Sequence, residues 1–135
     1  MNFSLKFLIV DDSETVREST RQALMSLGFT HMTEAHDGVE AMCKIHEAQE
    51  NNKQFDLILV DWLMPQMKGI EVIKACKADA KLKHLHFMII TSEQESVNVL
   101  EGLRSGAVDF ITKPFTAETL AIKIERALVK MKIAS

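Results

Sequence analysis

Short continuous apolar runs alternate along this chain with longer segments whose apolar residues recur at helical spacing. The runs are rich in branched and aromatic side chains, which is typical of strands buried on both faces. They are Leu5–Val10, Met32–Ala35, Phe55–Val60, Leu85–Ile90 and Phe110–Ile111. Parallel strands need helical crossovers of this length between them, and those crossovers are right-handed. The sequence therefore predicts an α/β fold, a doubly wound five-stranded parallel sheet with helices on both faces.

The segments between and after these runs are expected to be helices. In the first and the last of them, apolar residues fall at positions i, i+4, i+8 and i+11, which places a stripe on one helix face. The five predicted helices are Val16–Leu27, Gly38–Gln49, Ile70–Ala78, Val97–Arg104 and Leu120–Met131. Ser13 and Thr116 precede the first and last helices as candidate N-caps, and Gly28 and Gly106 follow helices as C-terminal stops.

Length and charge narrow the class of protein. A chain of 135 residues is expected to form one domain over 1–135. Sixteen Lys or Arg against 19 Asp or Glu give a net charge of −3, which disfavours direct nucleic-acid binding. The longest apolar runs are far shorter than the roughly 20 residues that span a bilayer, so we expect no membrane insertion. Two widely separated cysteines, Cys43 and Cys76, fit a reducing, cytoplasmic location.

Polar residues follow or end the predicted strands. Asp11 and Asp12 follow the first strand in the chain, Asp61 the third, Thr91 the fourth and Lys113 the fifth. Ligand sites in open parallel sheets form at this carboxyl edge, so these side chains are expected to converge. Three crowded acids raise the pKa of at least one of them unless a cation is present, and carboxylates with water suit Mg²⁺. The set predicts a pocket that accepts a phosphoryl group.

Each of these features also has a purely structural interpretation. An acidic pair after a strand commonly caps the following helix, as Asp11 and Asp12 could. A single Asp at a strand end and a Lys-Pro step both occur in ordinary loops. The functional interpretation depends on the combination, because the predicted fold brings all of these residues to one edge of the sheet.

Five segments of the chain carry a family resemblance. They are Phe7–Ser13, Ala35–Gly38, Asp56–Pro65, Ile90–Ser92 and Gly106–Phe115. In this order the chain resembles the response-regulator receiver family, and within it the small single-domain regulators of chemotaxis. The resemblance covers essentially the whole chain, and it implies the flavodoxin-like strand order 2-1-3-4-5.

The resemblance assigns chemical roles to the residues at the strand ends. It implies that Asp61 is the phosphoacceptor, and that Asp11, Asp12, Asp61 and the backbone carbonyl of Leu63 hold Mg²⁺. The phosphoryl donor would be a phosphohistidine of a histidine kinase or of a histidine phosphotransfer protein. The protein would catalyse its own phosphorylation and dephosphorylation, with the help of Lys113, and would otherwise be a switch and not an enzyme.

The resemblance also implies a switch and an output surface. Thr91 would move toward the phosphoryl group, and the ring of Phe110 would turn into the vacated space. A downstream effector protein would then bind the face formed by the fourth helix, the fifth strand and the fifth helix, and the protein is expected to be a monomer. Composition alone favours the simpler interpretation of Phe110 as an ordinary core aromatic residue.

Some positions depart from the family pattern or have simpler expectations. Leu63 is apolar where the chemotaxis regulators carry a polar residue beside the route of an attacking water, so the phosphoryl lifetime is open. Trp62 is expected to lie near the site and outside the core, and Asp109 is expected to be a turn residue.

Three other functions remain to be weighed. The chain could be a receiver-like interaction module that works without phosphorylation, a receiver fragment of a longer regulator, or a phosphatase or nucleotide-binding enzyme on a similar fold. The intact set of strand-end residues disfavours the first. The chain has no Gly-rich phosphate loop ending in Gly-Lys-Ser/Thr, which disfavours the last.

Overall fold

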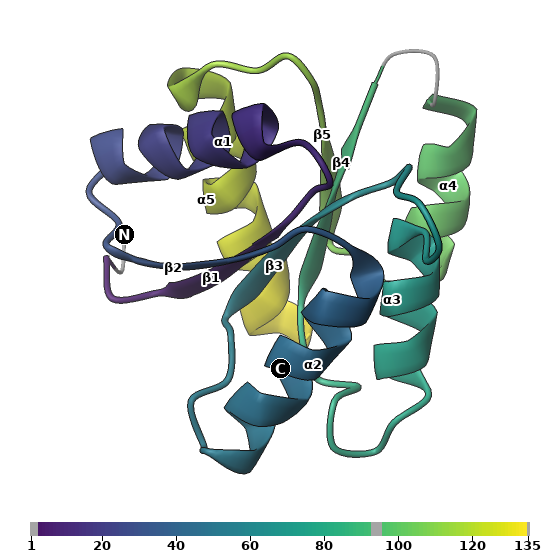
Figure 1. Cartoon of the computed structure of the whole chain (residues 1–135). Coiled ribbons are helices and arrows are strands. Elements are labelled where there is room, and N and C mark those ends of the chain that lie inside the picture. The colour runs from purple at the N-terminus through teal and green to yellow at the C-terminus, as the bar shows by residue number, and fades with distance from the viewer. Residues whose placement is uncertain (1–2, 93–95, 135) are drawn as a thin grey trace.

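A computed structural model describes residues 3–92 and 96–134 of the chain (Figure 1). The strands are β1 (Lys6–Val10), β2 (His31–Ala35), β3 (Leu57–Asp61), β4 (Phe87–Thr91) and β5 (Asp109–Thr112). The helices are α1 (Glu14–Ser26), α2 (Gly38–Glu50), α3 (Gly69–Lys77), α4 (Ser96–Arg104) and α5 (Ala117–Ala134). All ten elements lie where the hydrophobic pattern predicts them, with bounds that differ by a few residues.

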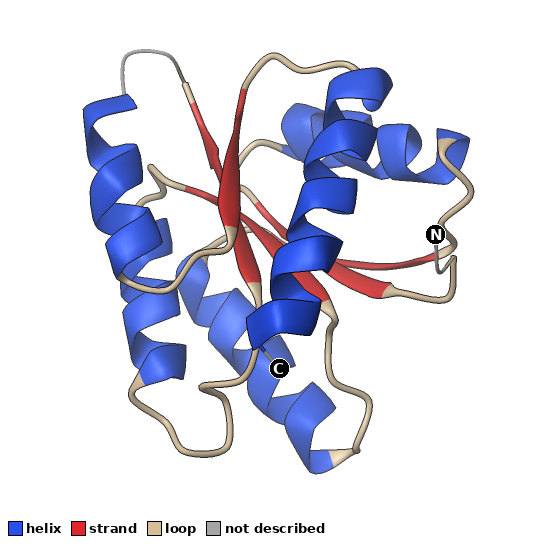
Figure 2. Cartoon of the chain, turned by 180° about the vertical axis from the view of Figure 1, so that it is seen from behind, coloured by secondary structure: helices blue, strands red, loops and turns tan. Residues whose placement is uncertain are grey.

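The strands form one parallel sheet in the order β2-β1-β3-β4-β5. Figures 1 and 2 show helices on both sides of it, with α1 and α5 on one face and α2, α3 and α4 on the other. This is the doubly wound, flavodoxin-like arrangement that the sequence predicted. The winding reverses direction between β1 and β3, so the carboxyl ends of these two neighbouring strands border the crevice where ligands bind in such folds.

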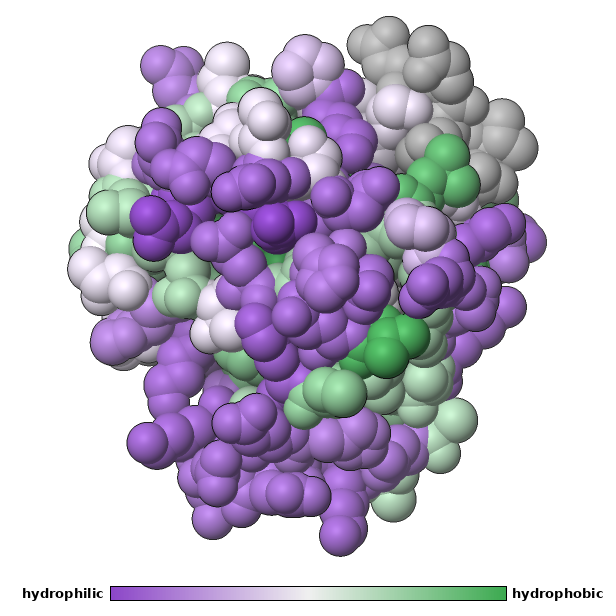
Figure 3. All heavy atoms as spheres, in the orientation of Figure 1, coloured by the Kyte–Doolittle hydropathy of each residue, from purple (hydrophilic) through white to green (hydrophobic). Residues whose placement is uncertain are grey.

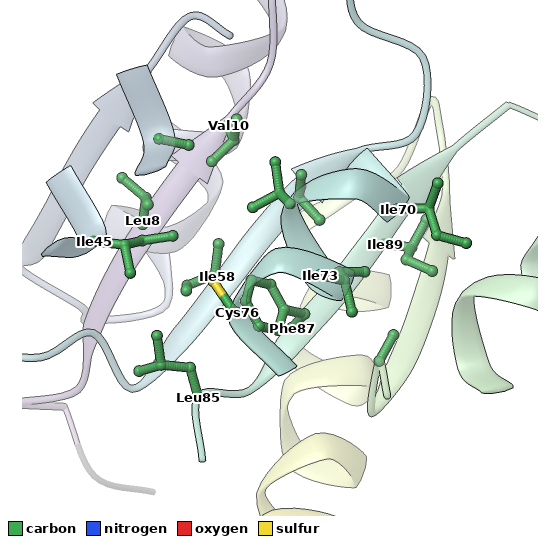
Figure 4. Close-up of a cluster of buried hydrophobic side chains, with 14 of the residues drawn as sticks. Leu8, Val10, Ile45, Ile58, Ile70, Ile73, Cys76, Leu85, Phe87 and Ile89 are labelled. Carbon is green, nitrogen blue, oxygen red and sulfur yellow. The ribbon is translucent and has the colours of Figure 1, made fainter. Parts of the chain in front are cut away.

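The sheet separates two hydrophobic cores. Successive side chains of a strand point to opposite faces, so Leu8 and Val10 pack against α2 and α3, whereas Phe7 and Ile9 pack against α1 and α5. Figure 4 shows the first of these cores, where Ile73 of α3 lies beside the strand residues. All of these strand side chains are fully buried, and together they hold the strand ends in fixed relative positions.

Hydrophilic residues predominate on the face of the molecule that Figure 3 shows. None of the helices in the described part of the chain is long and apolar enough to cross a membrane.

The predicted helix ends are also confirmed. The Ser13 hydroxyl accepts a hydrogen bond from the Val16 amide at the start of α1, and the Thr116 hydroxyl accepts one from the Thr119 amide at the start of α5. Gly28 and Gly106 have φ values of 103° and 118°, a left-handed conformation that favours glycine after a helix.

Candidate functional site

The carboxyl edge of the sheet brings the predicted polar residues together. Asp11 and Asp12 directly follow β1, Asp61 ends β3, and Lys113 directly follows β5. The three aspartates each offer a carboxylate oxygen within 4.8 Å of the others. The ammonium of Lys113 lies 3.1 Å from Asp61 Oδ1 and 3.5 Å from Asp11 Oδ2. Residues separated by up to 102 positions in sequence therefore form one acidic pocket with one cation.

Burial makes this pocket electrostatically unfavourable for its acids. Asp11 and Asp61 are almost fully buried, at 0% and 2% exposure. Burial, reinforced by the neighbouring Asp11 carboxylate, raises the pKa of Asp61 to about 6 even though Lys113 opposes the shift. Burial also raises the pKa of Asp11, against the opposing effects of the Ser13 amide and Lys113. At least one pKa in the acidic cluster is raised, as predicted, but burial is the larger cause and repulsion between the carboxylates the smaller one. Both effects favour an added cation.

Lys113 responds in the opposite way. Burial alone would lower its pKa, but Asp61 and Asp11 outweigh burial and hold the pKa of the ammonium above its ordinary value. Lys113 therefore remains charged at neutral pH. Its backbone amide also donates to the Thr91 carbonyl at 2.8 Å, and the Lys113–Pro114 peptide bond is cis.

The backbone around Asp11 is held by several hydrogen bonds. The Ser13 amide donates to Asp11 Oδ1 at 2.9 Å, and the Asp11 amide donates to the Ala35 carbonyl at 3.1 Å. Arg17 of α1 donates to the Asp11 carbonyl at 2.7 Å and pairs with Glu34 of β2 at 3.1 Å. Asp11 is consequently fixed in position.

Asp12 has a different environment, because its side chain is exposed. A rigid buried acid and an exposed acid are thus placed side by side at the end of β1. The exposed carboxylate can move toward a ligand that enters from solvent, whereas its neighbour presents a fixed oxygen.

The loop after β3 approaches the phosphoacceptor candidate closely. The Gly69 amide donates to the Trp62 carbonyl at 3.1 Å, and a β-carbon at position 69 would lie 2.3 Å from the Asp61 carbonyl oxygen. Only glycine leaves room for this approach. Leu63, two residues after Asp61 at the start of the same loop, is 51% exposed.

Thr91 and Phe110 lie on the neighbouring strands β4 and β5. Thr91 is buried and ends β4, where it pairs in register with Thr112. Phe110 pairs in register with Ile89, two residues before Thr91. The ring of Phe110 is partly buried against the α2–α3 core. The two predicted switch residues thus lie on adjacent strands, with the hydroxyl at the pocket end.

The structure corrects two expectations. Trp62 is only 4% exposed and belongs to the α2–α3 core. Its ring lies close to Gly102 of α4, where a β-carbon would be 2.0 Å from Ile89 Cδ1 and 3.0 Å from Trp62 Cζ3. Asp109 is not a turn residue. It begins β5, is 3% exposed, and lies within 4 Å of cationic side chains of α5.

The donor set fits a hard divalent cation. Carboxylate oxygens together with water are the ligands that Mg²⁺ prefers, and a bound cation would oppose the effects of burial and of neighbouring carboxylates that raise the pKa values of Asp61 and Asp11. Fold and pocket together define a doubly wound domain with three carboxylates and one ammonium gathered at the carboxyl edge of its sheet.

Comparison with known proteins identifies the class. The profile of the response regulator receiver domain matches residues 7–125, and the chain belongs to this family. It is 39% identical over 122 residues to the chemotaxis protein CheY of Pseudomonas aeruginosa, covering 90% of this chain and 94% of that protein. It is 37% identical over 131 residues to CheY-3 of Vibrio cholerae, covering 97% of each chain.

A solved structure agrees with these relatives. CheY4 of Vibrio cholerae superimposes with a TM-score of 0.80 at 33% identity, over 92% of this chain and 98% of that one. The chain is therefore a CheY-like receiver of two-component signalling, a class of switches and not of classical enzymes. Receiver domains bind Mg²⁺ at an acidic cluster, and Asp11, Asp12 and Asp61 form such a cluster here.

Proposed function

We propose that this chain is a stand-alone response regulator in which Asp61 accepts a phosphoryl group from a phosphohistidine. The observation that carries this proposal is the position of the Asp61 carboxylate, buried at the carboxyl edge of the sheet with the Lys113 ammonium 3.1 Å away. The donor is a histidine kinase or a histidine phosphotransfer protein, and residues 1–135 act as one receiver domain.

Asp11, Asp12 and Asp61 would hold Mg²⁺ together with the backbone carbonyl of Leu63. When bound, the ion neutralises the acids and the phosphoryl oxygens. Asp11 is suited to this role because its backbone and one carboxylate oxygen are fixed by hydrogen bonds. Asp12 is suited because its exposed side chain can adjust to the ion.

Phosphoryl transfer forms one bond and breaks one. A carboxylate oxygen of Asp61 attacks phosphorus in line, the phosphorus–nitrogen bond to the donor histidine breaks, and the imidazole leaves with its electron pair. The Lys113 ammonium, whose pKa is raised, stays protonated and stabilises the equatorial oxygens. Water later attacks the acyl phosphate and releases inorganic phosphate. Both steps use the same pocket, so the protein catalyses its own phosphorylation and dephosphorylation.

The phosphoryl group would be read through Thr91 and Phe110. It adds about −1.5 to −2 charge and three acceptor oxygens at one point. The Thr91 hydroxyl would move toward these oxygens and make room for the Phe110 ring. Such an element needs only two conformations of similar energy, which the phosphoryl group biases. The changed face is α4-β5-α5, where a downstream effector protein binds.

Labelling the wild-type protein tests this proposal. Incubation with acetyl phosphate and Mg²⁺ should add one phosphoryl group per molecule, and EDTA should prevent the addition. Borohydride reduction followed by peptide mass spectrometry should locate the group on the peptide that contains Asp61. Modification at another residue, or labelling that persists in EDTA, would contradict the assigned site.

The lifetime of the phosphoryl group is expected to depend on Leu63. Its side chain is 51% exposed two residues after Asp61, and in this proposal it hinders a water that approaches the phosphoryl group. Leu63→Asn replaces an apolar group by one that can hydrogen-bond water, so we expect dephosphorylation to become several-fold faster. Decay of labelled protein after removal of acetyl phosphate measures this rate. Val39→Asn, at an equally exposed apolar residue of α2, is the control, and equal decay in wild type and Leu63→Asn would remove Leu63 from the mechanism.

A further inference from the structure

Asp109, the first residue of β5, lies at the centre of a cluster of charged side chains that has no role in the proposed phosphoryl transfer. The carboxylate of Asp109 is 3% exposed. Its Oδ1 lies 3.4 Å from Lys123 Nζ, and its Oδ2 lies 3.4 Å from Lys130 Nζ and 3.8 Å from Arg126 Nε. The three cations recur every three or four residues along α5, so they occupy one helix face. One buried acid thus holds this face of α5 against β5.

Asp109 also contacts the switch candidate beside it. Its Oδ1 accepts a hydrogen bond of 2.8 Å from the Phe110 amide. Burial alone would raise the pKa of Asp109, but this amide together with Lys123 and Lys130 outweighs burial, and the pKa lies below its ordinary value. The carboxylate is therefore ionised at neutral pH and can orient the ammonium groups around it.

One of these cations lies over the ring of Phe110. Lys123 Nζ is 4.3 Å from the ring centroid, within the range of a cation–π contact. The Lys123 side chain is 17% exposed, whereas those of Lys130 and Arg126 are 44% and 57% exposed. Lys123 is thus well shielded from water while it bridges the Asp109 carboxylate and the aromatic ring.

We propose that Lys123 is a positioning residue for the switch: fixed by Asp109, it holds the Phe110 ring in its resting orientation. This inference rests on the proposed switch role of Phe110, and it adds a residue that opposes the turn of the Phe110 ring toward Thr91. On this proposal, a ring that turns toward Thr91 moves away from Lys123 Nζ, so the cation–π contact favours the ring orientation described here. Its loss therefore shifts the equilibrium toward the turned ring without any phosphoryl group.

The chain offers a matched control for this contact. Lys130 lies at the same 3.4 Å from the Asp109 carboxylate, on the same helix face, but it donates to the Val108 carbonyl at 2.9 Å. Its ammonium contacts no aromatic ring among the described residues. Lys123→Met and Lys130→Met each remove one cation from Asp109, and only Lys123→Met removes the contact with the ring.

The orientation of the Phe110 ring can be measured directly by NMR. Three-bond couplings from the backbone nitrogen and carbonyl carbon to Cγ of Phe110 report its χ1 populations in the unphosphorylated protein. We expect Lys123→Met to raise the population of the minor rotamer about threefold, a change typical of a weak cation–π contact. Lys123→Arg, which keeps a cation over the ring, should restore the wild-type populations, and Lys130→Met should leave them unchanged. Thermal melts confirm that each variant is folded.

Two results would overturn the proposal. Unchanged Phe110 populations in Lys123→Met would show that the ammonium does not hold the ring. Equal shifts in Lys123→Met and Lys130→Met would show that the effect acts through the charge of Asp109 and not through the ring contact. No phosphoryl group is needed in this experiment, so failure of Asp61 as the phosphoacceptor would appear in the labelling experiment and not here.

Discussion

Asp61→Asn is expected to abolish phosphoryl labelling by acetyl phosphate. The amide has the shape of the carboxylate but lacks the anionic oxygen that attacks phosphorus. It also removes the negative charge of one of the three carboxylates whose oxygens lie within 4.8 Å of one another. The phosphorylated fraction, measured by intact-protein mass spectrometry in the presence of Mg²⁺, should fall to background.

A second aspartate variant distinguishes loss of the nucleophile from loss of charge. Asp12→Asn keeps the Asp61 carboxylate but removes an exposed oxygen from the pocket. We expect it to be labelled more slowly than wild type and still on Asp61. Asp79→Asn, in the loop after α3 at the opposite edge of the sheet, should label like wild type. Undiminished labelling of Asp61→Asn would refute the assignment of the phosphoacceptor.

Asp61→Asn should also stabilise the metal-free protein at neutral pH. The folded pKa of Asp61 is about 6, against an ordinary value of 3.8. Between these values the folded state binds more protons than the unfolded state, so the free energy of unfolding falls as pH rises through this window. Above pH 6 the ionised carboxylate destabilises the fold by roughly 3 kcal/mol. Asn carries no charge, so Asp61→Asn should recover most of this free energy above pH 6 and little near pH 4.

Urea unfolding in EDTA, repeated across this pH range, measures the effect. Asp109→Asn is the contrasting control, because it removes a buried acid whose pKa is lowered, whereas the pKa of Asp61 is raised. The folded pKa of Asp109 is lowered, so its ionised form stabilises the protein above its ordinary pKa, and that contribution is lost as pH falls through the lowered value. Asp109→Asn should therefore destabilise at neutral pH. A neutral-pH stability of Asp61→Asn at or below wild type would contradict the repulsion inferred for the pocket.

The strands and the pocket could be predicted because each depends on a local pattern. A continuous apolar run such as Leu57–Val60 is buried on both faces in any doubly wound sheet. The residue that follows the run must then lie at the carboxyl edge, which places Asp61 without further information. The family resemblance added the roles of Thr91 and Phe110, and the structure places both on the expected strands.

The two wrong expectations depended on packing between distant segments. Trp62 is buried in the α2–α3 core and lies close to Gly102 of α4, and residues 40 positions apart give no local signal of such a contact. In the sequence alone Asp109 resembles a turn residue, because nothing near it indicates that cations of α5 pack against its carboxylate. Lys123, Arg126 and Lys130 do share one helix face, but a row of cations is also typical of a solvent-exposed face, so their spacing alone could not identify Asp109 as a buried acid.

The approach of Gly69 to Asp61 limits how this chain can vary. A methyl group at position 69 would lie 2.3 Å from the carbonyl oxygen of Asp61, so either the start of α3 or the end of β3 would have to move. A movement at the end of β3 changes the distance between the Asp61 carboxylate and Lys113, although Gly69 has no functional group of its own. A new loop grafted between Trp62 and Lys68 must therefore still be followed by glycine at position 69, where α3 begins.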